Sequence, residues 1–182
     1  MQPLLVAYAS TEGHTRKVAE FIAERLRIRG HRVDLVDTAG PAAAQVQPIY
    51  QGVLLGGSLH HDKLQGSLAA FIKANKPWLG VLPLGFFTVS LSAALPEAQG
   101  RAELEQAVQR FLAETGVQPV STAQVAGAIR HAELDYFKRL LLRQVMARTG
   151  AGNDWRSDHE YTDWPQVEAF VDAYLRAAGI AG

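Results

Sequence analysis

Six consecutive residues near the start of the chain combine hydroxyl groups, a glycine and a histidine in an order that suits phosphate binding. They are Ser10, Thr11, Glu12, Gly13, His14 and Thr15. Hydroxyls and the N–H groups of a helix start can hold a phosphate, helped by the helix dipole, and a glycine lets the backbone approach it closely. The loop has neither the lysine of a nucleoside triphosphate site nor the Gly-x-Gly-x-x-Gly spacing of a dinucleotide site. We therefore expect it to bind a terminal phosphate monoester, the alternative being that Ser10 and Thr11 only cap a helix.

Two later segments place polar and apolar residues together where strands are expected to end. The first is Ser58, Leu59, His60, His61 and Asp62, and the second is Thr88, Val89, Ser90, Leu91 and Ser92. A flat tricyclic ring needs apolar walls along its faces and backbone donors and acceptors at its polar edge, and both segments offer them. Each segment alone also fits an ordinary polar turn. Their positions after the third and fourth strands favour a ring-binding site.

The adjacent histidines His60 and His61 do not predict a metal site. Neighbouring side chains of an extended chain point in different directions, and no further ligand cluster accompanies these two. For one of them, a substrate contact or an acid–base role stays open beside that of a solvated loop residue. No catalytic triad or carboxylate pair stands out, so no catalytic residue is assigned. A phosphoacceptor receiver domain is rejected, because it needs clustered aspartates after its first strand, where this chain has Ser10, Thr11 and Glu12.

The elements that must position these segments alternate regularly between strand and helix. Continuous apolar runs such as Leu4 to Tyr8 are typical of strands buried on both faces of a parallel sheet, and Val18, Ile22 and Leu26 share one helical stripe. Strands are expected at residues 4–8, 32–37, 52–58, 82–91 and 121–129, and helices from 15 to a stop at Gly30, then at 67–76, 97–115 and 164–178. This alternation predicts an α/β fold with a doubly wound five-stranded parallel sheet. In such sheets, ligands bind outside the carboxyl ends of the strands.

One connection breaks the regularity, because residues 130–162, between the fifth strand and the last helix, exceed the length of an ordinary loop. We interpret them as an insertion in one domain that spans residues 1–182. A helix is expected from Glu133 to Arg148, with an apolar stripe of Leu134, Phe137, Leu141 and Val145. A basic amphipathic helix of this kind can lie on an anionic membrane surface. The alternative is that the stripe packs against the domain and the arginines are solvated.

The charge balance and the lack of cysteine exclude several classes of protein. Among 182 residues, 18 are Lys or Arg and 18 are Asp or Glu, so no basic surface predicts nucleic-acid binding. Without cysteine, disulfides, thiolate catalysis and iron–sulfur clusters are excluded. No signal peptide or membrane-spanning run is visible in the sequence. We expect a cytoplasmic protein, with residues 133–148 as the segment for peripheral contact with the inner face of a membrane.

With these segments in place, the chain resembles the flavodoxin superfamily and, within it, the menaquinone-dependent protoporphyrinogen IX dehydrogenase family. The resemblance covers nearly the whole chain. It is carried by Ser10-Thr11 with Gly13-His14-Thr15, by Gly56-Gly57-Ser58-Leu59, by Phe87-Thr88-Val89-Ser90-Leu91, by Ala126-Gly127-Ala128-Ile129-Arg130 and by Tyr161-Thr162-Asp163-Trp164. The first motif is typical of flavodoxin-like FMN binding, and the last two are more specific for the narrower family. The chain departs from the family at His60-His61 and in an insertion that is less basic than expected.

This resemblance implies a flavodoxin-like fold and FMN as the cofactor. It implies that Ser10 to Thr15 bind the FMN phosphate, and that Ser58 to His60 and Thr88 to Leu91 frame the isoalloxazine ring. It also implies the oxidation of protoporphyrinogen IX to protoporphyrin IX in haem synthesis, with a quinone as the electron acceptor. The partners are then the porphyrinogen substrate and the quinone.

Three alternative functions stay open at this stage. A plain electron-carrier flavodoxin is expected to be acidic and has no need of the helical insertion. An NAD(P)H-dependent quinone reductase needs no Rossmann motif, because nicotinamide can stack on an exposed flavin. A flavin-free interaction module would keep only the fold, and the intact phosphate loop argues against it.

Overall fold

The structure, a computed structural model, describes residues 2–59, 63–90, 93, 98–129 and 159–181. Six of the residues singled out in the sequence lie outside these ranges: His60, His61, Asp62, Leu91, Ser92 and Arg130. So does the helix expected at residues 133–148.

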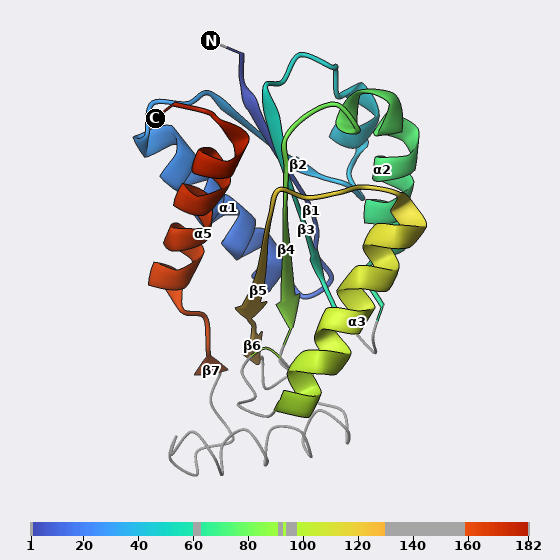
Figure 1. Ribbon diagram of the computed structural model, residues 1–182, viewed down its shortest axis with the longest axis vertical. Coiled ribbons are helices and arrows are strands. Elements are labelled where there is room, and N and C mark those ends of the chain that lie inside the picture. Colours follow the sequence, from blue (N-terminus) through green and yellow to red (C-terminus); the bar gives the residue numbers. More distant parts are fainter. Residues whose placement is uncertain (1, 60–62, 91–92, 94–97, 130–158, 182) are drawn as a thin grey trace.

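Five parallel strands form the central sheet, in the order β2-β1-β3-β4-β5 (Figure 1). They are β1 (Leu4–Ala9), β2 (Val33–Asp37), β3 (Gly52–Ser58), β4 (Leu84–Ser90) and β5 (Ser121–Ala126). Every residue of β1, β3 and β4 is buried, which is why their sequences read as continuous apolar runs rather than alternating ones. The predicted α/β fold with a doubly wound five-stranded parallel sheet is confirmed.

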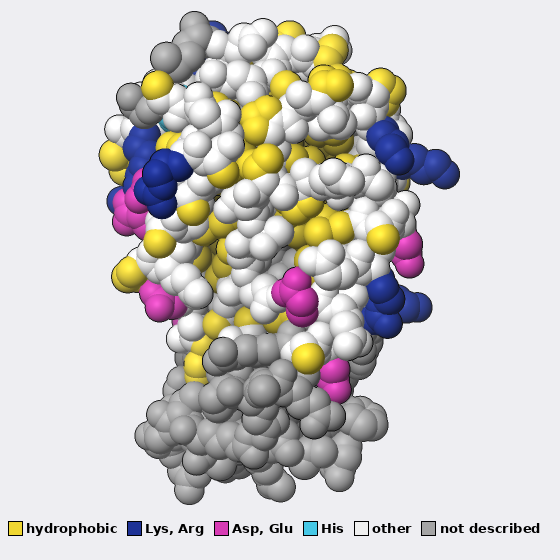
Figure 2. Space-filling model, viewed as in Figure 1, with side chains coloured by type: hydrophobic (Ala, Val, Ile, Leu, Met, Phe, Trp, Pro, Cys, Tyr) yellow, Lys and Arg dark blue, Asp and Glu magenta, His cyan; other side chains and the backbone are white. Residues whose placement is uncertain are grey.

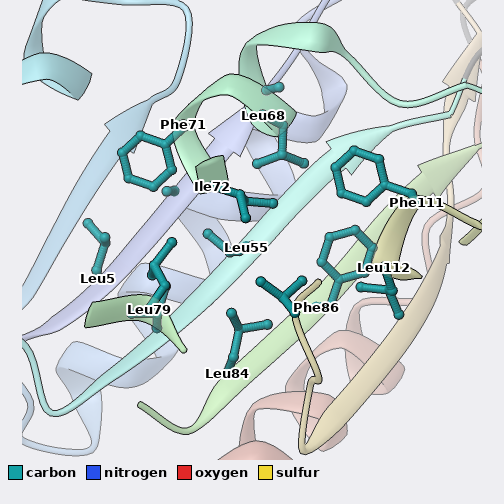
Figure 3. Close-up of a cluster of buried hydrophobic side chains, with 14 of the residues drawn as sticks. Leu5, Leu55, Leu68, Phe71, Ile72, Leu79, Leu84, Phe86, Phe111 and Leu112 are labelled. Atoms are coloured by element: carbon teal, nitrogen blue, oxygen red, sulfur yellow. The ribbon is translucent and has the colours of Figure 1, made fainter. Parts of the chain in front are cut away.

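Helices cover both faces of the sheet (Figure 1). One face is covered by α1 (His14–Ile28) and α5 (Trp164–Ala178), and the other by α2 (Gly66–Leu79) and α3 (Ala98–Thr115). A short 3₁₀ helix, η1 (Pro41–Gln45), follows β2. Figure 3 shows the core under α2 and α3, where Leu68, Phe71 and Ile72 meet the apolar side chains of the sheet.

Three glycines of the sheet leave space for large side chains that pack on the face covered by α1 and α5. Tyr174 of α5 is fully buried, and its hydroxyl donates to the Pro83 carbonyl at 3.1 Å. A Cβ atom at Gly52 would collide with that hydroxyl, and one at Gly85 would lie 2.9 Å from the tyrosine ring. A Cβ atom at Gly56 would collide with the Phe87 ring. These positions therefore need glycine for packing, not for an unusual backbone angle.

Two element boundaries differ from the prediction, the end of the fifth strand and the end of the second helix. The fifth strand ends at Ala126 rather than at residue 129, and after Gly127 the chain forms β6 (Ala128–Ile129), which pairs antiparallel with β7 (His159–Glu160). The second helix continues to Leu79, with Pro77 inside its last turn. Asp163 is the N-cap residue of α5, and its side chain accepts the Gln166 N–H at 3.1 Å.

A buried histidine lies at the end of the molecule opposite the carboxyl ends of the strands. His31 follows Gly30, whose φ of 88° ends α1 as expected, and it is 5% exposed. Among the described residues, neither of its ring nitrogens has a hydrogen-bond partner. Burial without a partner disfavours the charged imidazolium and lowers the pKa of His31 below its ordinary value.

This burial predicts that stability falls in mild acid. The pKa of His31 is lower in the folded than in the unfolded chain, so the stabilisation is complete above the unfolded pKa, about 6.5, and is lost as the pH falls toward the folded pKa. We expect that part of the pH dependence to disappear in His31→Leu. Denaturant unfolding at several pH values between about 5.5 and 8 measures it. An identical pH dependence in the two proteins would contradict the prediction.

Candidate functional site

The predicted phosphate and ring segments meet at one edge of the sheet. The strands are parallel, so their carboxyl ends lie together, at the lower end of the view in Figure 1. From β1 the chain passes to α1 on one face, and from neighbouring β3 it passes to α2 on the other. Ligands of open α/β sheets bind at this kind of switch point.

The loop between β1 and α1 is shaped by Gly13. Its φ of 86° and ψ of −13° are left-handed, which explains why glycine stands there, and it is the N-cap of α1. Its N–H donates to Ser10 Oγ at 3.0 Å, and its carbonyl accepts the first helical hydrogen bond, from Lys17, at 3.2 Å. The Gly13 N–H, one of the backbone groups expected near the phosphate, therefore forms a hydrogen bond within its own loop.

This loop keeps donors for a phosphate. A hydroxyl has one proton and two lone pairs, so Ser10 can accept from Gly13 and still donate. The amides of Thr15 and Arg16 precede the first helical hydrogen bond, so the helix itself provides no partner for them. The helix dipole places partial positive charge at the same point. The loop is therefore suited to an anion.

The ends of β3 and β4 are more buried than the sequence suggested. Thr88, Val89 and Ser90 are the last three residues of β4, within the strand predicted at residues 82–91, and are 1%, 4% and 6% exposed. They lie in the strand because β4 is flanked on both sides: β3 pairs with it up to Val89 and β5 pairs with it up to Ser90. Ser58 is likewise the last residue of β3 and is buried, and Leu59 packs against the core.

Gln65, which the sequence analysis did not single out, joins two of the predicted segments. It is the N-cap residue of α2, and its side-chain amide donates to Thr11 Oγ1 at 3.2 Å and also contacts Ser58 Oγ. Its Oε1 atom is buried, has no hydrogen-bond partner among residues 2–59, 63–90, 93, 98–129 and 159–181, and lies 3.1 Å from the point that a Cβ atom of Gly57 would occupy. A glutamine before a helix carries no distinctive pattern, so a signal for this role is not visible in the sequence.

Two buried polar atoms near Gly57 have no hydrogen-bond partner within the part of the chain that the structure describes. One is Gln65 Oε1, and the other is Oγ1 of Thr88, the residue that pairs with Gly57 across the sheet. A buried polar atom that finds no hydrogen bond costs about 1–3 kcal/mol. Together with the anion-binding loop, these atoms fit a ligand that carries a phosphate at one end and further polar groups beyond it, as FMN does.

A second set of contacts ties α1 to the segment before α5. His14 Nε2 lies 2.7 Å from Thr162 Oγ1, and the Thr162 hydroxyl donates to the Ala126 carbonyl at 2.7 Å. Lys17 forms an ion pair with Glu160, and this bond lowers the pKa of the Glu160 carboxyl below its ordinary value. The predicted loop residue His14 is therefore held from outside its own loop.

Comparison with known proteins agrees with this geometry. Residues 5–155 match the family model described as a flavodoxin domain, so the chain belongs to the flavodoxin family. FMN is accordingly its cofactor. Flavodoxin 1 of Bacillus cereus superposes with a TM-score of 0.54 at 16% identity, over 96% of this chain and 97% of that one, which shows the shared fold.

The curated relatives point to a narrower group within that family. Over 167 residues the chain is 26% identical to protoporphyrinogen IX dehydrogenase [quinone] of Escherichia coli K12, a match that covers 92% of this chain and 91% of that protein. It is 28% identical over 174 residues to a protein of the same name from Leishmania major, covering 93% and 73% of the two chains. The resemblance identified in the sequence is thereby confirmed.

The phosphate loop makes a prediction about ligand choice. Replacing Thr15 with valine should remove a hydrogen bond to a charged group and weaken FMN binding by about 1.5–3 kcal/mol, while riboflavin, which lacks the phosphate, should bind as before. Titration of the apoprotein with each flavin, followed by flavin fluorescence, measures both affinities. Thr122→Val makes the same chemical change at an exposed position of β5 and serves as the control. Equal losses for the two flavins would contradict the assignment.

Gln65 gives a second prediction of the same kind. Gln65→Glu keeps the shape of the side chain but places a negative charge beside Thr11 in the phosphate loop. We expect FMN to lose about 1–3 kcal/mol more binding free energy than riboflavin, and added salt to reduce the difference. Gln65→Met, which removes the hydrogen bonds without adding charge, separates the two effects. A charge effect that is the same for both flavins would place the amide away from the phosphate.

Proposed function

We propose that this protein oxidises protoporphyrinogen IX to protoporphyrin IX and passes the electrons to a quinone, as an FMN-dependent oxidoreductase of haem biosynthesis. The observation that carries this proposal is the 26% identity to the Escherichia coli enzyme along 92% of the chain. A likeness confined to the flavodoxin core would support FMN binding alone. The Leishmania major relative, which has the same name, adds independent support.

In this proposal, two groups of residues at the carboxyl ends of the strands hold the two ends of FMN. Ser10, Thr11, Glu12, Gly13, His14 and Thr15 bind the phosphate, and Ser58, Leu59, His60, Thr88, Val89, Ser90 and Leu91 frame the ring. FMN, when bound, supplies the group that takes up an electron pair and gives it to an acceptor. The chain contributes binding and orientation, and the buried ends of β3 and β4 keep water from the inner side of the site.

The redox balance needs two partners. Each pair of electrons leaves the porphyrinogen together with two protons and reduces one quinone to a quinol. A quinone dissolved in a membrane suits a protein that reaches the membrane surface from the cytoplasm. Among the described residues, no helix is long and apolar enough to span a bilayer. We assign the peripheral contact to residues 133–148 on the strength of their sequence pattern.

Two other redox functions are the alternatives to this proposal. A dedicated electron carrier would present a strongly acidic surface to basic partners. On the face shown in Figure 2, acidic and basic side chains are interspersed over the described surface, in keeping with a formal charge of zero. An NAD(P)H-dependent quinone reductase would share the FMN site and differ in the electron donor.

An anaerobic assay separates the three functions. The FMN-loaded protein is mixed with protoporphyrinogen IX and a quinone, with NADPH and the quinone, or with the quinone alone, and porphyrin fluorescence and quinol formation are followed. We expect rapid formation of porphyrin and quinol in the first mixture only, and none with apoprotein. Faster quinol formation from NADPH would favour the quinone reductase, and no turnover with either donor would favour a carrier.

A further inference from the structure

The hydroxyl of Thr162 makes two hydrogen bonds at once. It donates its proton to the Ala126 carbonyl, and the same oxygen lies 2.7 Å from His14 Nε2. Because its proton is already given to Ala126, the oxygen must accept from the imidazole, so Nε2 carries hydrogen. Thr162 therefore connects the first residue of α1 with the last residue of β5.

Neighbouring side chains strengthen this connection. Glu160 accepts from Lys17 in the first turn of α1 and, at 2.8 Å, from the indole N–H of Trp164. The Lys17 ammonium also lies 5.3 Å from the centre of the Trp164 ring, within the range of a cation–π interaction. Since two residues of the first turn of α1 are contacted from the same segment, the whole turn is held and not a single side chain.

The segment that holds α1 is itself attached to the ends of the sheet. The Gly127 N–H donates to the Ser90 carbonyl at 3.0 Å, and the Tyr161 N–H donates to the Gly127 carbonyl at 3.1 Å. These bonds run from the end of β4, through the residue after β5, to the residue before Thr162. The start of α1 is thereby connected, through hydrogen bonds, to the ends of β4 and β5.

We propose that Thr162 is a positioning residue of the cofactor site, which orients the start of α1 so that its amides meet the FMN phosphate. The proposal rests on the assignment of Ser10 to Thr15 to the phosphate. Binding energy is reciprocal, so a segment that improves phosphate binding is itself stabilised when the phosphate binds. Binding of FMN and the hydrogen bonds that attach the segment around Thr162 to the sheet therefore stabilise each other.

The hydroxyl, not the bulk of the side chain, carries this role. Thr162→Val keeps the shape but removes both hydrogen bonds, leaving the imidazole N–H of His14 without its acceptor. Thr162→Ser keeps the hydroxyl. Asp163→Ala is the matched control, because it removes the N-cap of α5 at the next position and destabilises the same region without touching His14.

The first test compares the affinities of apoprotein variants for FMN and riboflavin. We expect Thr162→Val to bind FMN about tenfold more weakly and riboflavin unchanged, because only FMN has the phosphate. Thr162→Ser should regain most of the loss, and Asp163→Ala should leave the ratio of the two affinities at its wild-type value. Equal losses for both flavins in Thr162→Val, or no loss, overturn the proposal.

The second test needs no variant to begin with. Hydrogen exchange at the Tyr161 amide reports on its bond to Gly127, and we expect FMN to slow this exchange while riboflavin has little effect. In Thr162→Val the slowing by FMN should be lost. Equal slowing by FMN in Thr162→Val and wild type overturns the coupling.

The same data separate this proposal from its premises. Wild-type protein that binds FMN and riboflavin equally overturns the phosphate assignment and the role of Thr162 with it. Wild-type protein that prefers FMN, with Thr162→Val unchanged, overturns only the role of Thr162. Neither measurement uses a porphyrinogen or a quinone, so both are independent of the proposed reaction.

Discussion

Burial of β1 between β2 and β3 is the constraint on which the rest of the structure depends. All six of its residues are buried, so both faces of the sheet must be covered. Helices α1 and α2 meet that need from opposite sides, and the chain must then leave β1 and β3 in opposite directions. This divergence opens the edge of the sheet at the end of β1, where the left-handed Gly13 turns the chain into α1. A demand of the hydrophobic core thus creates a polar site.

The site places polar atoms inside the hydrophobic core, and this lowers the stability of the fold. Thr88 Oγ1 and Gln65 Oε1 are buried in a region otherwise packed with apolar side chains, and no described residue forms a hydrogen bond with either atom. Such atoms weaken the fold unless a ligand completes their hydrogen bonds. The neighbouring Gly57 keeps the space beside them narrow, because even a Cβ atom there would lie 2.7 Å from Leu64. We interpret the region as one in which the protein gives up some stability in the absence of the cofactor to bind it selectively.

The sequence predicted the order of the elements and the phosphate loop because both depend on local patterns. Buried parallel strands need apolar runs, a left-handed turn needs glycine, and Gly13, Gly30 and Gly116 all have positive φ at helix ends. It did not predict Gln65, since the contact with Thr11 crosses 54 positions and depends on how α2 packs. It also extended β5 too far, because the two-residue strands β6 and β7 gain their order from each other and not from their own composition. Features that depend on neighbouring residues could be predicted from the sequence, whereas contacts between single side chains far apart in the chain could not.

The bonds between α1 and the segment before α5 also bear on how the protein is made. His14 and Thr162 are 148 positions apart, and Lys17 and Glu160 are 143 apart. On the ribosome, α1 and its loop emerge long before their partners are synthesised, and contacts of this separation form late. Until residue 162 has left the exit tunnel, the start of α1 lacks the groups that hold it. A chain that has been synthesised only as far as residue 161 therefore contains the whole phosphate loop but lacks the hydroxyl that holds the first residue of α1.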